Sequence, residues 1–335
     1  MIIDVHTHIV PEHFPPAANR SSADEWPYME HVGQGRANVI IGGRNFRTVL
    51  ARCWDVGRRL EEMPEEGADR QVLSPMPELL AYQLSPEDGR DLSRHLNECV
   101  VRMVEEQPDR FYGLGAVPLQ DPEMATAELE GVKAMGLRGV EVMTNINGQS
   151  LGDQAFSSFF RQAERLGLAV FVHAQRPTFT ARMSGPRALV ANGVAFPIEN
   201  GLAAAALITG GVLQDCPSVR ICMSHGGGVI AQMLPRMDMA WLRAKEEDRG
   251  GLAKSPTEYA RQLYFDDILF STDSLRLLAN TVGISQIMIG SDYPFMSRSM
   301  MPTIDEEFRE LGLTENEIKA VSELNCLRFL GIPGR

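Results

Sequence analysis

Two histidines separated by one residue, His6 and His8, stand near the amino terminus in the run His-Thr-His. Side chains two residues apart in an extended segment point the same way, so both imidazoles can reach one metal ion. Three more residues with metal-ligand chemistry, His173, His225 and Asp292, each end a short apolar run. Imidazoles combined with a carboxylate suit zinc or another first-row divalent cation, and such a site can activate a water molecule.

Eight short runs rich in Val, Ile and Phe resemble buried strands, and helix-length amphipathic segments separate them. This alternation predicts an α/β fold of right-handed βαβ units, and eight units favour a closed (β/α)8 TIM barrel over an open sheet. An open doubly wound sheet would want a Gly-rich phosphate turn after the first strand, which the sequence lacks. Barrel active sites lie at the carboxyl ends of the strands, where the candidate ligands stand. The predicted strands are 2–5, 71–74, 111–117, 139–143, 169–173, 219–225, 263–267 and 287–292.

The length of 335 residues suits one barrel domain spanning 1–335. Residues 11–46 are rich in Pro, Gly, Ser and Asn and show little periodicity, which predicts an irregular insertion after the first strand. Capping signals predict helices that begin after Ser85, Asp121 and Thr314.

The lysines bear on the number of metal ions. Binuclear metal hydrolases of this architecture bridge their ions with a carboxylated lysine, and no lysine of this chain ends a predicted strand. We therefore predict one divalent ion per chain, Zn2+ first and Mn2+ as the alternative. Glu141, inside the fourth predicted strand, is either a bridge to a second ion or, as we expect, a buried partner of the ligands. The four lysines are Lys133, Lys245, Lys254 and Lys319.

Composition excludes several classes of partner. The chain has 32 basic and 44 acidic residues, a net charge of −12, which argues against nucleic acid as a partner. Five scattered cysteines without a Cys-x-x-Cys pair indicate a reducing compartment. The first residues lack a basic segment, and Pro197 and Glu199 interrupt the most apolar stretch, 188–213. We expect a soluble, cytoplasmic protein that does not enter a membrane.

Five runs together resemble the decarboxylase branch of the amidohydrolase superfamily, which includes α-amino-β-carboxymuconate-ε-semialdehyde decarboxylases and resorcylate-type aromatic decarboxylases. The resemblance covers nearly the whole chain except residues 15–43. It implies a zinc-dependent barrel that forms a homodimer. The runs are HTH at 6–8, FRTVLARCWD at 46–55, FVHAQRP at 171–177, MSHGGGVIAQMLPRMD at 223–238 and IGSDYPF at 289–295.

Residue roles follow from this resemblance by position. It implies a metal centre of three histidines and one aspartate, and it makes His225 the catalytic base beside Asp292. Arg47 matches an arginine that binds the substrate carboxylate, and Arg236 matches a second one that reaches in from the neighbouring subunit. A planar guanidinium suits both roles because it binds a carboxylate bidentately and stays charged. The implied ligands are His6, His8, His173 and Asp292.

The sequence departs from the family pattern at two places that border the substrate. Residues 174–176 read Ala-Gln-Arg where the family has Pro-Trp-Asp, and Met296-Ser297 replaces Pro-Leu. We therefore expect the metal chemistry to be kept and the substrate to differ. Arg176 becomes a further candidate contact to a substrate carboxylate.

The predicted activity is metal-dependent, non-oxidative decarboxylation of a small unsaturated or aromatic carboxylic acid. A metal-dependent hydrolase of a lactone or cyclic amide, or a hydratase, is the alternative, because an activated water serves all of these reactions. A metal-containing binding protein without activity is a third possibility. His225 argues against it, since a binding module needs no base beside its metal.

Overall fold

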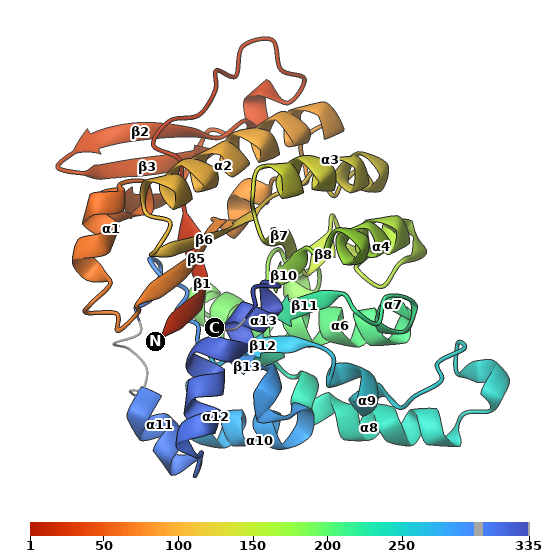
Figure 1. Cartoon of the computed structure of the whole chain (residues 1–335). Coiled ribbons are helices and arrows are strands. Elements are labelled where there is room, and N and C mark those ends of the chain that lie inside the picture. Colours follow the sequence, from red (N-terminus) through yellow and green to blue (C-terminus); the bar gives the residue numbers. More distant parts are fainter. Residues whose placement is uncertain (298–303, 334–335) are drawn as a thin grey trace.

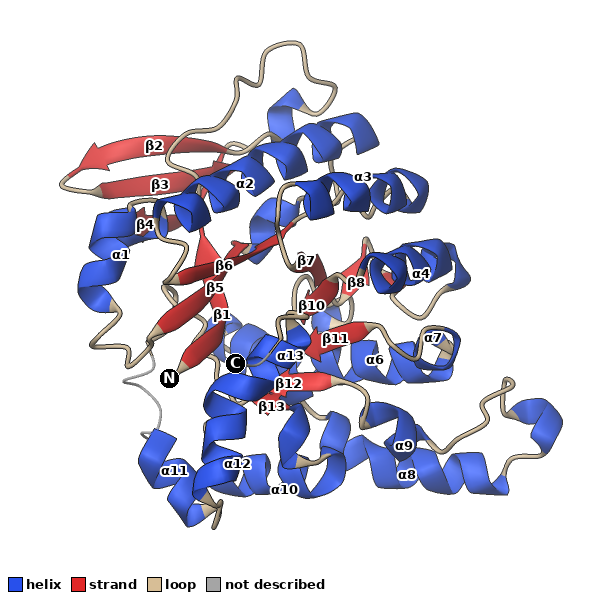
Figure 2. Cartoon of the chain, viewed as in Figure 1, coloured by secondary structure: helices blue, strands red, loops and turns tan. Residues whose placement is uncertain are grey.

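The computed structural model describes residues 1–297 and 304–333. Eight parallel strands follow one another in chain order at the centre of the molecule, and helices surround them (Figures 1 and 2). All eight predicted strands are confirmed, because each predicted range overlaps one of them. They are β1 (Ile3–Ile9), β5 (Arg70–Pro75), β6 (Phe111–Gly115), β7 (Gly139–Met143), β10 (Ala169–His173), β11 (Arg220–Met223), β12 (Tyr264–Asp266) and β13 (Ile287–Met288).

Backbone hydrogen bonds join the last strand to the first. The amide of Val5 donates to the carbonyl of Ile289 at 2.8 Å, and the amide of His8 donates to the carbonyl of Tyr293 at 2.7 Å. In the other direction, the amide of Asp292 donates to the carbonyl of His6 at 2.9 Å. The chain after β13 thus runs beside β1 and closes the sheet, which confirms the predicted (β/α)8 barrel.

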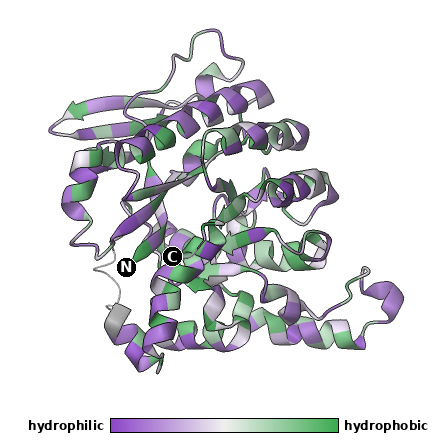
Figure 3. Ribbon diagram, in the orientation of Figure 1, coloured by the Kyte–Doolittle hydropathy of each residue, from purple (hydrophilic) through white to green (hydrophobic). Residues whose placement is uncertain are grey.

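Helices cover the outside of the barrel, and their starts follow the capping signals. The side chains of Ser85, Asp121 and Thr314 accept hydrogen bonds from the first turns of α2, α3 and α12. Helices α2 and α3 carry both polar and apolar residues along their length (Figure 3), as expected of helices with one buried side. The helices are α1 (Val56–Glu62), α2 (Pro86–Glu106), α3 (Pro122–Ala134), α4 (Ser157–Leu166), α5 (Arg187–Val190), α6 (Phe196–Thr209), α7 (Val212–Asp215), α8 (Ile230–Arg243), α9 (Pro256–Ala260), α10 (Thr272–Val282), α11 (Ile304–Glu310), α12 (Glu315–Lys319) and α13 (Asn325–Phe329).

The insertion after β1 is more regular than the sequence predicts. An antiparallel sheet of β2 (Tyr28–Gly33), β3 (Arg36–Ile41) and β4 (Arg44–Leu50) occupies much of it, so the expectation of an irregular segment over 11–46 was wrong there. The glycines that suggested a loop instead make tight turns, since Gly42 and Gly43 both have positive φ between β3 and β4. The sheet projects beyond the barrel beside α2 (Figure 1), and its last strand carries Arg47.

No helix within residues 1–297 and 304–333 is long and apolar enough to cross a membrane. The five cysteines are all buried and form no disulfide.

Candidate metal centre

The structure brings all five candidate centre residues together at the carboxyl ends of the strands. The ligand atoms of His6, His173, His225 and Asp292 lie within 4.8 Å of one another. His8 Nε2 lies 3.1 Å from His6 Nε2 and 3.1 Å from Asp292 Oδ1. Residues from both ends of the chain thus meet at one point of the barrel.

Neighbouring groups orient two of the histidine rings toward this centre. His6 Nδ1 lies 2.7 Å from Asp266 Oδ2, and His173 Nδ1 lies 2.9 Å from the carbonyl oxygen of Ala174. An acceptor at Nδ1 holds the ring proton there and leaves the Nε2 lone pair free to bind a metal. His173 Nε2 is buried and has no hydrogen-bond partner among the described residues. A buried acceptor left without a partner is costly, so a cation fits this position.

Neighbouring groups also orient the His8 ring, through contacts to its Nδ1 atom. Its Nδ1 lies 3.3 Å from the carbonyl oxygen of Pro75 and 3.7 Å from Glu141 Oε2. Burial raises the pKa of Glu141 to about 7. Glu141 and His8 also form a group with His173 whose ligand atoms lie within 4.8 Å of one another. A second ion there would need two histidines that the first centre already uses, which favours Glu141 as a buried partner of the ligands.

The protonation states suit cation binding. Burial would raise the pKa of the Asp292 carboxyl group, but the neighbouring His225, His8 and His6 outweigh burial and hold that pKa well below its usual range. Burial lowers the pKa of His6 and lowers that of His173 well below the ordinary value. Around neutral pH Asp292 is therefore an ionised carboxylate, and His6 and His173 are neutral imidazoles, which are the forms that bind metal.

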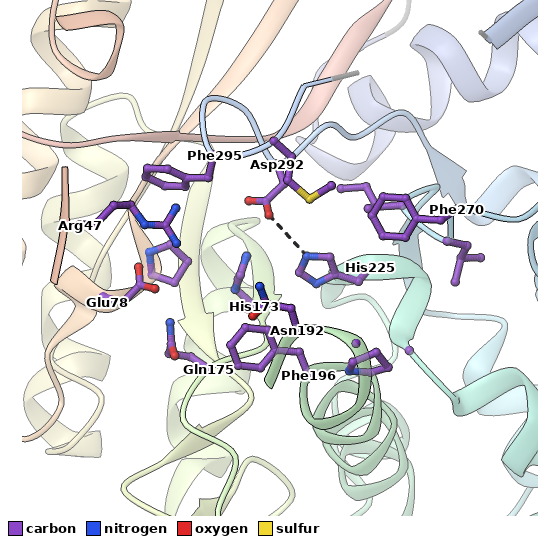
Figure 4. Close-up of a pocket in the computed structure, with 17 residues that line it drawn as sticks. Arg47, Glu78, His173, Gln175, Asn192, Phe196, His225, Phe270, Asp292 and Phe295 are labelled. Atoms are coloured by element: carbon purple, nitrogen blue, oxygen red, sulfur yellow. Dashed lines mark ion pairs between the residues drawn. The ribbon is translucent and has the colours of Figure 1, made fainter. Parts of the chain in front are cut away.

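His225 is placed differently from the other histidines. Its Nε2 lies 3.8 Å from Asp292 Oδ2 (Figure 4), and its Nδ1 lies 3.0 Å from Ser224 Oγ and 3.4 Å from Asn200 Nδ2. Burial would lower the pKa of His225, but the carboxylates of Asp292 and Asp266 raise it above the ordinary value. The ring can therefore hold and release a proton near neutral pH. Both His225 and Asp292 have positive φ, a conformation that costs energy and often occurs at functional sites.

Asp266, at the end of β12, connects the ligands to the turn that carries His225. Besides His6, it accepts hydrogen bonds from the backbone amides of His225 at 2.9 Å and Gly226 at 2.8 Å. One carboxylate thus fixes both a ring of the centre and the candidate base. No role was predicted for Asp266, although its place at the end of the seventh barrel strand was a usable signal.

A cavity of about 570 Å³ opens above the centre. His173, His225 and Asp292 line it together with the aromatic side chains of Phe196, Phe270 and Phe295 (Figure 4). Arg47 also lines it, and its guanidinium carbon lies 4.1 Å from the centroid of the Phe295 ring. The cavity therefore combines aromatic walls with one cationic group and is large enough for a single-ring acid.

The two other candidate arginines lie outside this cavity. Arg176 lines a neighbouring cavity of about 320 Å³ together with Tyr82 and Asn147. Arg236 is exposed on α8 and does not line the cavity of its own chain. Substrate roles for both residues stay predictions.

Comparison with known proteins places the chain in a family. A family model described as amidohydrolase matches residues 3–332. The chain belongs to the amidohydrolase family. This amidohydrolase is similar in sequence to the 2-amino-3-carboxymuconate-6-semialdehyde decarboxylase of Dictyostelium discoideum. The two are 32% identical over 332 residues, which cover 98% of this chain and 91% of the relative.

Solved structures share the fold of this amidohydrolase. The 5-carboxyvanillate decarboxylase of Sphingomonas paucimobilis superposes with a TM-score of 0.79 at 23% identity, covering 99% of each chain. A dihydroxybenzoic acid decarboxylase from Polaromonas, solved with bound manganese and 2-nitroresorcinol, has a TM-score of 0.75 at 21% identity and covers 98% of this chain and 96% of its own. The matches extend over the barrel and the insertion together.

The contacts of Asp266 in this amidohydrolase predict a role in metal affinity. Asp266→Asn keeps the shape of the side chain but removes its charge and turns one of its two acceptor oxygens into a donor, which weakens the contacts that fix the His6 ring and the turn of His225. We expect Zn²⁺ affinity to fall about 10–100-fold, the usual effect of removing such a partner. Competition with a chromogenic chelator measures the Zn²⁺ affinity of the variant and of the wild type. Asp88→Asn, at a buried aspartate of α2 that bonds to Ser22, is the control. Unchanged affinity in folded Asp266→Asn would contradict the assignment.

Proposed function

We propose that this amidohydrolase is a metal-dependent, non-oxidative decarboxylase of a small aromatic or unsaturated carboxylic acid. One observation carries the proposal: Arg47, a carboxylate-binding group, lines the same cavity as the cluster of His173, His225 and Asp292. Similarity over almost the full length to a relative named as a decarboxylase supports it.

For the cofactor we propose one divalent ion per chain, Zn²⁺, held by His6, His8, His173 and Asp292. The Nδ1 contacts of the three histidines support this assignment because they leave each Nε2 available. Mn²⁺ is the alternative, and the manganese in the Polaromonas structure supports it. A bound divalent cation would act as a Lewis acid toward a substrate oxygen.

The protein's own residues then have distinct tasks. Arg47 binds a carboxylate of the substrate, and Phe196 and Phe295 hold the planar acid and exclude water. His225 delivers a proton to the carbon that bears the departing carboxylate, which interrupts the conjugation of the acid. The carbon–carbon bond then breaks, its electron pair restores the conjugation, and CO2 leaves. Asp292, with Oδ2 3.8 Å from His225 Nε2, stabilises the protonated imidazole before the transfer.

We also propose that residues 1–335 act as one domain in a cytoplasmic homodimer, in which Arg236 contacts the substrate of the neighbouring subunit. The exposed position of Arg236 on α8 supports this, as do two exposed apolar side chains of the same helix, Met239 and Leu242. The match of the family model to residues 3–332 supports a single domain. The buried, unpaired thiols suit a reducing compartment.

Release of CO2 tests the proposed function. The zinc-loaded protein, incubated with a panel of hydroxybenzoates and muconate-type acids, should release one CO2 for each acid consumed. The hydrolase alternative predicts acid formation from lactones or cyclic amides without CO2. If the loaded protein releases CO2 from no acid in the panel and opens a lactone, the decarboxylase proposal is wrong.

Paired histidine variants test the division between ligand and base. His225→Ala should keep about one metal per chain and lose 10²–10⁴-fold in kcat, because general acid–base catalysis is typically worth that factor. His173→Ala should lose both metal and activity, since the remaining groups hold zinc less firmly. Elemental analysis and steady-state kinetics measure the two effects. A metal-free His225→Ala beside a loaded His173→Ala would reverse the assignment.

Mixed dimers test the role of Arg236. Arg236→Ala and His225→Ala should each be inactive as homodimers. When the two are mixed and allowed to exchange subunits, one of the two sites has both His225 and a partner arginine, so activity should partly return. No recovery, with subunit exchange verified by mass, would place Arg236 outside the neighbouring site.

A further inference from the structure

Of the residues from Gln71 to Tyr82, Pro77 and Glu78 line the cavity, and Glu78 is the one with a charged side chain. It lies in the short 3-10 helix η3 (Pro77–Leu80), which follows β5 directly. Every other residue from Gln71 to Tyr82 is buried, and Glu78 alone is half-buried. The amide of Met76 donates to the carbonyl of Ile9 at 2.9 Å and ties the start of this segment to β1. The backbone beneath Glu78 is therefore fixed, and its side chain lines the cavity.

Among the described residues the Glu78 carboxylate has no direct contact with a protein donor, although its charge opposes the lowering of the Arg176 pKa by burial. Within residues 1–297 and 304–333, it accepts no hydrogen bond and has no ion-pair partner within 4.0 Å. Water can satisfy it while the cavity is open. A substrate that fills the cavity displaces that water, so the carboxylate then needs a donor from the substrate itself.

Arg47 lies on the same wall of the cavity as Glu78, across from His225 and Phe270 (Figure 4). The two side chains do not form an ion pair with each other, since no nitrogen–oxygen pair between them lies within 4.0 Å. Stacking on Phe295 instead holds the guanidinium in place. This wall thus offers a bidentate donor and, next to it, a separate anionic acceptor.

A molecule complementary to this wall carries a carboxylate for Arg47 and an N–H or O–H donor for Glu78. An ether or methyl group at the second position would leave Glu78 desolvated and unpaired, which a site built for hydrogen bonding rejects strongly. A second carboxylate there would meet a like charge. This wall therefore favours acids that satisfy both Arg47 and Glu78, and it disfavours acids that leave Glu78 unpaired or bring a second negative charge to it.

We propose that Glu78 is a specificity-determining residue that selects carboxylic acids bearing a hydroxyl or amino group beside the carboxylate that Arg47 binds. The inference rests on the proposed function for the role of Arg47 as the carboxylate anchor. It adds a requirement of this chain's own cavity, a hydrogen-bond donor at a defined place on the substrate.

Binding of matched benzoates to the zinc-loaded protein tests this proposal without requiring turnover. The probes are the hydroxy, methoxy and carboxy derivatives of benzoate, substituted at position 2 in one series and at position 3 in another. Calorimetric titration should show, in at least one series, the hydroxy acid binding about tenfold or more tightly than the methoxy acid, as a hydrogen bond to a charged group allows. In Glu78→Gln, this ratio should fall to within about threefold, and the dicarboxylate should bind about tenfold more tightly than to the wild type.

Arg47→Gln is the matched control, because it lies on the same wall and contacts the group that all probes share. It should weaken every probe by a similar factor and leave the hydroxy-to-methoxy ratio unchanged. Glu78→Ala, with metal content and melting temperature compared with the wild type, repeats the test should the glutamine variant fold poorly. A ratio near one in the wild type in both series, or a ratio unaltered by both Glu78 variants, overturns the proposal.

Failure of this proposal and failure of the proposed function give different results. Selective binding that depends on Glu78, in a protein that releases no CO2, overturns the decarboxylase function alone. CO2 release from acids with and without the donor at equal kcat/KM, in the wild type, overturns the role of Glu78 alone.

Discussion

The contact between β1 and the segment that follows β13 holds the metal centre together. His6 and His8 belong to one side of this junction and Asp292 to the other, and the amide of Asp292 donates directly to the carbonyl of His6. Buried polar groups reinforce it, since the hydroxyl of Ser291 donates to Asp4 Oδ2. Closing the barrel therefore also brings the candidate ligands His6, His8 and Asp292 together, and opening of this seam would separate them.

Buried carboxylates make this arrangement costly unless each has partners. The imidazole of His6 and the backbone amides of His225 and Gly226 all bond to the Asp266 carboxylate and stabilise its charge. For Asp292, the surrounding His225, His8 and His6 outweigh burial and hold its pKa well below the usual range. Asp266 therefore positions neighbouring groups, whereas Asp292 is itself a candidate ligand.

The sequence was most informative where burial was complete. The barrel strands are predictable because strands buried on both faces appear as short apolar runs, and the ligands because they end those runs. The sheet of β2 to β4 was missed because β2 has no buried residue and so shows no hydrophobic alternation. The role of Asp266 depends on partners 41 and 260 residues away, and that of Glu78 on being the only partly exposed residue of a buried segment. Neither property is visible in local sequence.

The elements that hold the centre differ from those that shape the cavity wall. Ligands come from the ends of the barrel strands, whereas Arg47 lies on the appended antiparallel sheet and Glu78 on a short turn. Substitutions at Arg47 and Glu78 themselves, which are both only partly buried, leave the hydrogen bonds that close the barrel in place. The proposed metal ligands and the proposed substrate contacts therefore belong to separate elements of the chain. A library confined to positions 47 and 78 would vary the two proposed substrate contacts while leaving the candidate ligands and the buried residues around those two positions unchanged.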